Sequence, residues 1–246
     1  MNNKLSRPTP DAIARQLRQE SGFGCCKCGH PIFQYHHIVP FGEEEHFRPE
    51  DMMVLCPNCH DEATQGAMPE KDQRKYKSHP YNKRRGFAQG LLTINDYGLL
   101  IRLGNNYFKG GGSIIQMDGN DIVRVGIHPE GFLELTTYLY NQQDDLLVSI
   151  VKNEWISGNV EPWDIEFKYR WLRIRERRGK INLTVDARKS PTNITAKLWR
   201  FGHLVYADSN ILRIDRHGLN CGFTSCTFTR RCIDFQTKPE MAVHIK

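Results

Sequence analysis

The stretch that decides the fold runs from Cys25 to His60, and it contains CCKCG (25–29), YHHIVP (35–40) and LCPNCH (55–60). Its ends are closed by two C-x-x-C pairs, Cys25 with Cys28 and Cys56 with Cys59. Two such pairs separated by a compact loop have the spacing of a zinc site. Each pair turns the chain so that two thiolates reach two corners of a tetrahedron, at a Zn–S distance of ~2.3 Å. A closed four-sulfur site leaves no position for water, so the sequence predicts a structural Zn²⁺.

Cys26 leaves the choice of the first ligand open. Cys25 and Cys28 have the usual spacing of a zinc-binding pair, whereas Cys26 and Cys28 have a tighter one. We expect Cys25 to be the ligand and Cys26 to be a spare thiol packed inside the turn.

The histidines of the same stretch are not needed as zinc ligands once the four sulfurs are assigned, so they can have another role. The ordered set C-x-x-C, His36-His37, C-x-x-C and His60 resembles the zinc-stapled HNH endonucleases. The resemblance covers residues 8 to about 80 and implies a ββα-metal fold. It also implies hydrolysis of DNA phosphodiester bonds with a catalytic divalent ion, which is Mg²⁺, Mn²⁺, Ni²⁺ or Zn²⁺.

The resemblance assigns a role to each histidine. His37 matches the general base, while His36 and His60 match ligands of the catalytic ion. An imidazole with an ordinary pKa near ~6.5 takes a proton at neutral pH. A bound cation stabilises the charge that develops on the phosphate. If the pair lies in a regular strand, the two side chains point to opposite faces, and both can serve one site only if a loop or bulge turns one of them.

Asp51 is a departure from the family pattern. It stands five residues before Cys56, where the family carries the middle Asn of its motif. An Asp accepts the hydrogen bonds of that position but cannot donate them. This substitution supports the alternative hypothesis of a degenerate, zinc-stabilised module that binds nucleic acid or docks a protein. A further alternative holds that the zinc staples the domain and the histidines play no catalytic part.

Composition limits the function classes. The chain has 246 residues, 39% hydrophobic content and a net charge of +6, which suit a folded protein with an anionic partner. No apolar run approaches the ~20 residues that span a membrane. The N-terminus lacks the apolar core of a signal peptide, so we expect a reducing, cytoplasmic setting and no membrane partner.

A basic segment follows the cysteine-rich stretch, and we expect it to bind the phosphates of double-stranded DNA. It comprises Lys71, Arg74, Lys75, Lys77, Lys83, Arg84 and Arg85. A solvated surface is the alternative reading. We also expect a helix from about Asp11, a short helix between Pro69 and Pro80, and a linker over 78–89. Residues 41–50 are expected to form an exposed acidic loop.

From about Gly90 onward, short apolar or alternating runs recur between Gly, Asn and Asp residues. The run from Ile165 to Trp171 alternates with a period of two, which predicts one half-buried strand. The fold class is therefore α+β, with an HNH nuclease domain over 1–85 and an all-β domain over 90–246. The second domain is a sandwich, barrel or solenoid. We expect it to have a recognition or regulatory role and to offer a surface for a protein partner.

Overall fold

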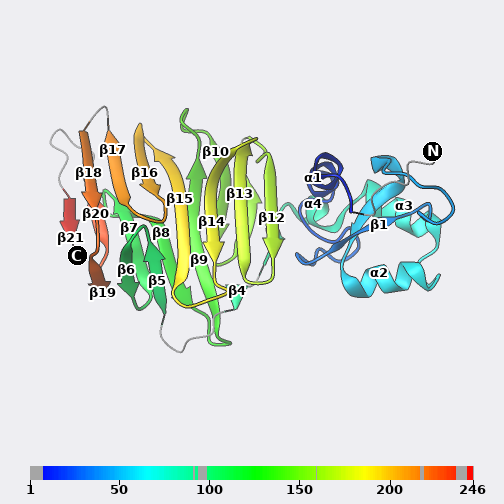
Figure 1. Ribbon diagram of the computed structural model, residues 1–246, viewed down its shortest axis with the longest axis horizontal. Helices are drawn as coiled ribbons and strands as arrows, with labels where there is room; N and C mark the ends of the chain where they lie inside the picture. Colours follow the sequence, from blue (N-terminus) through cyan, green and yellow to red (C-terminus); the bar gives the residue numbers. More distant parts are fainter. Residues whose placement is uncertain are drawn as a thin grey trace, which may run out of the picture. The chain divides into compact units, whose positions relative to one another are not determined.

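The computed structural model describes residues 8–90, 92–93, 99–158, 160–216, 219–236 and 243–245. The chain divides into two compact units, Met1–Gly90 and Leu91–Lys246. The first contains the helices, and the second is built from strands (Figure 1). No helix in the described part of the chain has the length and apolar character needed to span a membrane.

The first unit is a β-hairpin surrounded by short helices. Its elements in chain order are α1 Asp11–Glu20, β1 Gln34–His37, the 3₁₀ helix η1 Pro49–Asp51, β2 Met52–Leu55, α2 Pro57–Thr64, α3 Glu70–Ser78, α4 Tyr81–Arg85 and the short strand β3 Ala88–Gln89. β1 and β2 pair in antiparallel fashion, and α2 follows β2 directly. This is the predicted ββα order.

Prolines and glycines set the ends of these helices. Pro57 occupies the first turn of α2, and Pro69 and Pro80 precede α3 and α4. Proline suits the start of a helix because its fixed φ is helical and the first N–H groups lack helical partners. Gly86 ends α4 with a φ of 77°, a conformation that glycine adopts without strain. The expected helices near Asp11 and after Pro69 are thus present.

All four residues of β2, which are Met52, Met53, Val54 and Leu55, are buried, so this strand is covered on both faces. Leu17 of α1 and Met68, which precedes α3, belong to the same core cluster. Three cysteines of the predicted zinc site, Cys25, Cys56 and Cys59, also belong to it. The metal site and the apolar core of this unit are therefore one structure.

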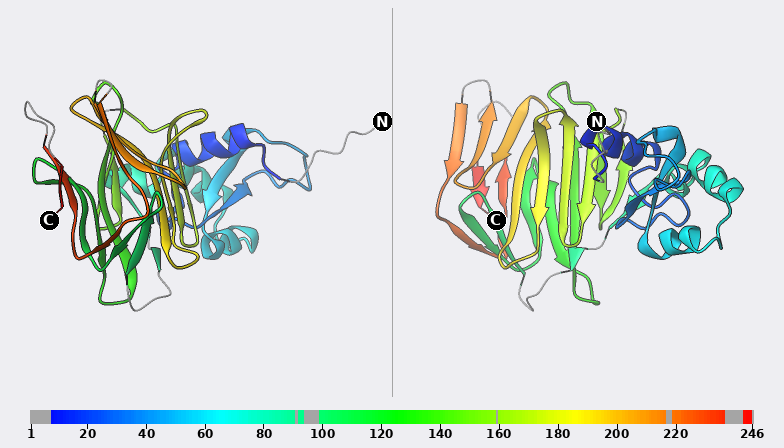
Figure 2. Two further views of the ribbon diagram at one scale, coloured as in Figure 1. Left: turned by 60° about the vertical axis from the view of Figure 1, so that its left-hand side comes forward. Right: turned by 45° about the vertical axis from the view of Figure 1, so that its right-hand side comes forward.

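The second unit contains two sheets in two layers (Figure 2). Its strands are β4 Leu92–Thr93, β5 Leu100–Leu103, β6 Asn106–Lys109, β7 Gly112–Met117, β8 Asn120–Ile127, β9 Phe132–Tyr140, β10 Leu146–Val151, β11 Glu154–Ser157, β12 Asp164–Lys168, β13 Trp171–Arg177, β14 Lys180–Asp186, β15 Thr192–Arg200, β16 His203–Ala207, β17 Leu212–Arg216, β18 Leu219–Phe223, β19 Thr227–Thr229, β20 Ile233–Phe235 and β21 Val243–Ile245.

One sheet runs β21-β20-β7-β8-β9-β10-β11, and β4 pairs with β9. The other runs β12 to β18 in chain order, and it also includes β5, β6 and β19. Most pairs are antiparallel, but β15–β5, β19–β6 and β20–β7 are parallel. Among the described strands neither sheet closes into a barrel. The all-β prediction is confirmed, and of its three forms the facing sheets correspond to a sandwich.

The side chains between the sheets form the core of this unit. Alternate residues of β9 and β15 are buried, as expected for strands with one face turned inward. Phe235 of one sheet lies 5.8 Å from the ring of His203 in the other, and Trp155 lies 5.6 Å from Phe167. These contacts join the two layers.

The prediction of one strand from Ile165 to Trp171 is wrong. Tyr169 and Arg170 form a tight turn between β12 and β13, and Lys168 pairs with Trp171 across it. Arg170 has a φ of 59°, and Tyr169 is exposed. The period of two continued through the turn because both arms of the hairpin alternate in the same way.

Candidate active site and metal centre

The four cysteines of the two C-x-x-C pairs meet in space. The sulfur atoms of Cys25, Cys28, Cys56 and Cys59 all lie within 4.8 Å of one another. The Sγ atom of Cys28 is 3.6 Å from that of Cys56 and 3.9 Å from that of Cys59. A tetrahedron with Zn–S bonds of ~2.3 Å has edges of about 3.8 Å. The two shorter separations match this edge, so the cluster is consistent with a four-sulfur zinc site.

Cys26 lies outside this cluster. Its backbone N–H bonds the carbonyl of Val54 on β2, and burial raises the pKa of its thiol to about 11. Burial and the neighbouring Cys25 raise the pKa of Cys28 to about 12. Thiols this close together ionise jointly only when a cation compensates their negative charges. A bound Zn²⁺ would supply that cation, since its cysteine ligands are thiolates. The four sulfurs are therefore consistent with a structural zinc site in which Cys25, and not Cys26, is the first ligand. Cys26 is buried beside that site.

His36 and His60 face one another across the hairpin and α2. Their ring centroids are 4.8 Å apart, and the planes cross at 88°. His60 is the fourth residue of α2, and its N–H bonds the carbonyl of Cys56, so the cysteine turn fixes where its ring points. Burial, together with the nearby rings of His60 and His37, lowers the pKa of His36 to about 4. The ring of His36 is therefore neutral at physiological pH.

Gln73 of α3 sets the tautomer of His36. The Nε2 atom of His36 lies 3.0 Å from Oε1 of Gln73, while Nε2 of Gln73 donates to the carbonyl of Met68 at 2.8 Å. The amide oxygen can only accept, so Nε2 of His36 donates to it. Its Nδ1 atom then keeps a free lone pair, which is the state that a metal ligand requires.

His37 points to the other side of β1. It lies against Phe41, His46 and Phe47, with its ring 5.1 Å from those of Phe41 and His46. Its Nε2 atom is 3.1 Å from the carbonyl oxygen of His46. A carbonyl oxygen only accepts, so Nε2 carries the proton and Nδ1 is the basic atom. Burial lowers the pKa of His37, so its ring is neutral at physiological pH and Nδ1 is free to accept a proton.

The hairpin register carries no bulge between the two histidines. His36 pairs with Met53 and His37 with Met52, and the N–H of Ile38 continues the ladder to the carbonyl of Asp51. The bulge that would turn both histidines toward one face is therefore absent from this register. His36 faces α2 and α3, whereas His37 faces residues 40–48, which we name the 40–48 loop.

The family model described as HNH endonuclease matches residues 25–66, which span the cysteine cluster and all three histidines. Residues 25–66 form an HNH endonuclease domain. Comparisons with curated proteins and with solved structures gave no match.

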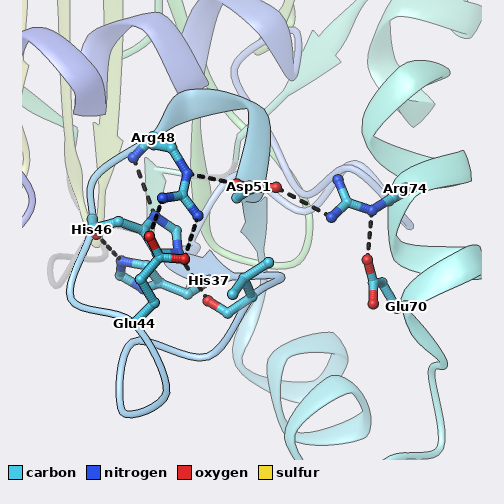
Figure 3. A network of polar contacts seen from close by, with 8 residues as sticks. His37, Glu44, His46, Arg48, Asp51, Glu70 and Arg74 are labelled. Atoms are coloured by element: carbon cyan, nitrogen blue, oxygen red, sulfur yellow. Dashed lines mark hydrogen bonds and ion pairs between the residues drawn. The ribbon is translucent and has the colours of Figure 1, made fainter.

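Asp51 of the HNH domain does not contact the histidine rings. Its Oδ2 atom accepts from Nε of Arg48 at 2.8 Å, and its Oδ1 atom accepts from Nη2 of Arg74 at 3.1 Å (Figure 3). The hydrogen bond from Arg48 and the contact with Arg74 lower the pKa of Asp51. The carboxylate that replaces the family's Asn is thus ionised and held by two arginines.

Several side chains of the basic segment make contacts within the first unit. Arg74 also donates to Glu70, and Lys77 lies 2.9 Å from Glu20. Arg84 and Arg85 lie over the ring of Tyr81, at 5.7 and 5.4 Å from its centroid. Lys71, Lys75 and Lys83 have exposed side chains. The structure therefore offers exposed positive charge here, with part of it neutralised by acids of the same unit.

The prediction of a linker over 78–89 is wrong, because α4 packs against the first cysteine turn. Asn82 is buried and donates through Nδ2 to the carbonyl of Gly22 at 3.0 Å. A Cβ atom added to Gly29, whose φ is 78°, would lie 2.4 Å from Oδ1 of Asn82. This close approach needs glycine, and it fixes the positions of Lys83, Arg84 and Arg85 relative to the zinc site.

Two residues with contacts to the predicted site were not expected from the sequence. Gln73 looks like one polar residue among the charged residues of α3, yet it is buried against His36. The one available signal is its spacing of three from Tyr76, which places both on the inner face of the helix. His46 was expected in an exposed loop; Glu43, Glu44 and Glu45 are exposed, but His46 is buried.

Proposed function

We propose that the protein is a metal-dependent endonuclease that hydrolyses phosphodiester bonds of double-stranded DNA. The observation that carries this proposal is the close approach of His36 and His60 within an HNH domain, with Nδ1 of His36 left unprotonated. Among the described residues, no group of three or more His, Cys, Asp and Glu side chains includes these two histidines. Two imidazoles would suit a divalent ion such as Mn²⁺, Ni²⁺ or Zn²⁺, which would supply stabilisation of negative charge on a phosphate.

In this proposal His36 and His60 hold the catalytic ion, and Gln73 keeps the ring of His36 in the correct tautomer. The bound ion supplies stabilisation of the charge that develops on the phosphate and the leaving oxygen. The residues Cys25, Cys28, Cys56 and Cys59 hold a structural zinc that is separate from it. Such a zinc fixes α2 and hence the position of His60.

His37 acts as the general base through Nδ1. Its Nε2–H is held by the carbonyl of His46, so the ring cannot turn freely, and Nδ1 is left to accept a proton from water. Because His36 and His37 lie on opposite faces of β1, the phosphodiester must lie across the end of the hairpin to meet both. The exposed lysines of α3 and α4 then contact the neighbouring phosphates without reading sequence.

The second unit is assigned to recognition or control, including a protein partner. Among the described residues, the one cluster suited to bind a metal is the four-cysteine site of the first unit, and the proposed catalytic histidines lie beside it. We therefore assign catalysis to the first unit. The second candidate function is a degenerate HNH module that binds nucleic acid without cutting it. It is favoured by Asp51, whose side chain is engaged with Arg48 and Arg74 in place of the family's amide.

Nicking of supercoiled plasmid, with Mg²⁺, Mn²⁺ or Ni²⁺ or with a chelator, separates the two functions. We expect metal-dependent nicking by the wild type and a loss of about 10²–10⁴ in rate for His37→Ala, the usual effect of losing a positioned base. His79→Ala is the matched control, because His79 is an exposed histidine whose ring bonds only locally with Ser78. Plasmid binding without nicking in any metal would favour the degenerate module. Wild-type rates in a folded His37→Ala protein would refute the base assignment.

A further inference from the structure

The 40–48 loop determines where the ring of His37 lies. His46 is buried inside this loop and makes three hydrogen bonds. Its carbonyl accepts from Nε2 of His37, its Nε2 donates to the carbonyl of Val39 at 3.0 Å, and its Nδ1 accepts from the N–H of Arg48 at 3.2 Å. A change in the loop would therefore move the carbonyl that accepts from Nε2 of His37.

The side chain of Arg48 ties this loop to the start of β2. Its Nη1 and Nη2 atoms donate to the two carboxylate oxygens of Glu44, at 2.5 and 2.9 Å. Its Nε atom donates to Asp51, which precedes β2 (Figure 3). Glu44 lies in the middle of the loop and Asp51 lies in η1, so one guanidinium spans the loop. The paired geometry with Glu44 is the strong form of such an ion pair.

We propose that Arg48 is a positioning residue for His37, acting through the 40–48 loop, and that Glu44 and Asp51 hold it in place. The inference rests on the proposed nuclease function and adds a residue to it. The side chain of Asp51 has no N–H to donate, so it cannot hold the loop by donating a hydrogen bond as an Asn would. Arg48 supplies the donors instead, and its reach to Glu44 closes the loop around His46.

The same network contains a matched pair that lacks this role. Arg74 also binds Asp51, and it pairs with Glu70 four residues before it, just as Arg48 pairs with Glu44 four residues before it. Glu44 and Glu70 have similar exposed fractions of 56% and 59%. Glu70 and Arg74 both lie on α3, however, so breaking their pair leaves every contact of the 40–48 loop in place. Glu70 is thus the control for Glu44.

The test compares Glu44→Gln and Arg48→Gln with Glu70→Gln in the full-length, zinc-loaded protein. In steady-state plasmid cleavage, kcat should fall roughly 10- to 100-fold for the first two, the scale of a small misplacement of a catalytic group. The KM for DNA and the zinc content should not change. Glu70→Gln should stay within about twofold of the wild type, since a lone exposed ion pair contributes little.

A second readout needs no activity. Nitrogen-15 NMR of the His37 ring distinguishes the Nε2–H from the Nδ1–H tautomer. We expect the wild type and Glu70→Gln to show Nε2–H alone, and Glu44→Gln and Arg48→Gln to show a mixture. Equal cleavage rates for Glu44→Gln and Glu70→Gln, or an unchanged tautomer in both loop variants, would overturn the inference. Absent cleavage by the wild type would refute the proposed nuclease, while the tautomer comparison would still decide whether Arg48 positions His37.

Discussion

The two units of the chain build their cores from different materials. In the first unit, four of the eleven described residues of the core cluster are cysteines, and three of these belong to the four-sulfur site. In the second unit, the core consists mainly of aliphatic and aromatic side chains between two sheets, such as Ile115, Leu135 and Phe235. The first unit should therefore depend on metal for its fold, and the second should not. Small domains with few apolar residues commonly need such a staple.

The largest expected effect follows from Cys56→Ser. Loss of one thiolate should release the zinc and unfold the first unit, because metal binding contributes to its folding free energy. All four tryptophans, Trp155, Trp163, Trp171 and Trp199, lie in the second unit. Their fluorescence should therefore remain that of the wild type while elemental analysis shows the zinc lost and limited proteolysis degrades residues 1–90.

Cys26→Ala is the control for this substitution. The thiol of Cys26 is buried beside the cluster but is not part of it. The variant should keep one zinc per chain and lose only the small packing contribution of a sulfur atom. Zinc loss from Cys26→Ala with retention in Cys25→Ser would reverse the ligand assignment.

A core truncation in the second unit should destabilise that unit and leave the zinc bound in the first. Phe235 is fully buried and lies against His203 of the facing sheet. Phe235→Ala should lower the free energy of unfolding of this unit by about 3–5 kcal/mol, as measured by denaturation followed through tryptophan fluorescence. The zinc content should stay at the wild-type value.

Phe201→Ala provides the comparison at the surface. Phe201 is 60% exposed and contacts Arg200, whose guanidinium lies 4.0 Å from its ring centroid. Removing it should cost at most about 1 kcal/mol. Similar losses for Phe201→Ala and Phe235→Ala would contradict a core between the sheets.

How far the sequence predicts the structure also differs between the units. The zinc site follows from short spacings, since each C-x-x-C pair is local, and the ββα order was implied by the family resemblance that these motifs carry. The contact of Gln73 with His36 spans 37 residues and depends on how α3 docks, which no local pattern encodes. The packing of Asn82 under the first cysteine turn was missed for the same reason, and so residues 78–89 were expected to be a linker. In the second unit the strands were predictable from their alternation, but parallel pairs such as β15 with β5 were not.

The smallest expected effect concerns DNA binding by the first unit. Arg84 and Arg85 lie at the end of α4, fixed there by Asn82. Replacing both with Ala should weaken binding to all duplex sequences alike. If each contacts one phosphate, the slope of log K against log salt should fall by about 1.8, since each contact contributes about 0.9. An unchanged slope in a filter-binding titration would make these residues a solvated surface.

Manganese binding tests the central assignment most directly, because His36 and His37 are adjacent but are given different roles. Mn²⁺ titrations followed by electron paramagnetic resonance can be made on the wild type, His36→Ala and His37→Ala, each with its structural zinc in place. We predict one Mn²⁺ site in the wild type and in His37→Ala with similar affinity, and strongly weakened binding in His36→Ala. Unchanged Mn²⁺ binding in His36→Ala, or its loss in His37→Ala alone, would contradict the division of metal ligand and base between these two residues.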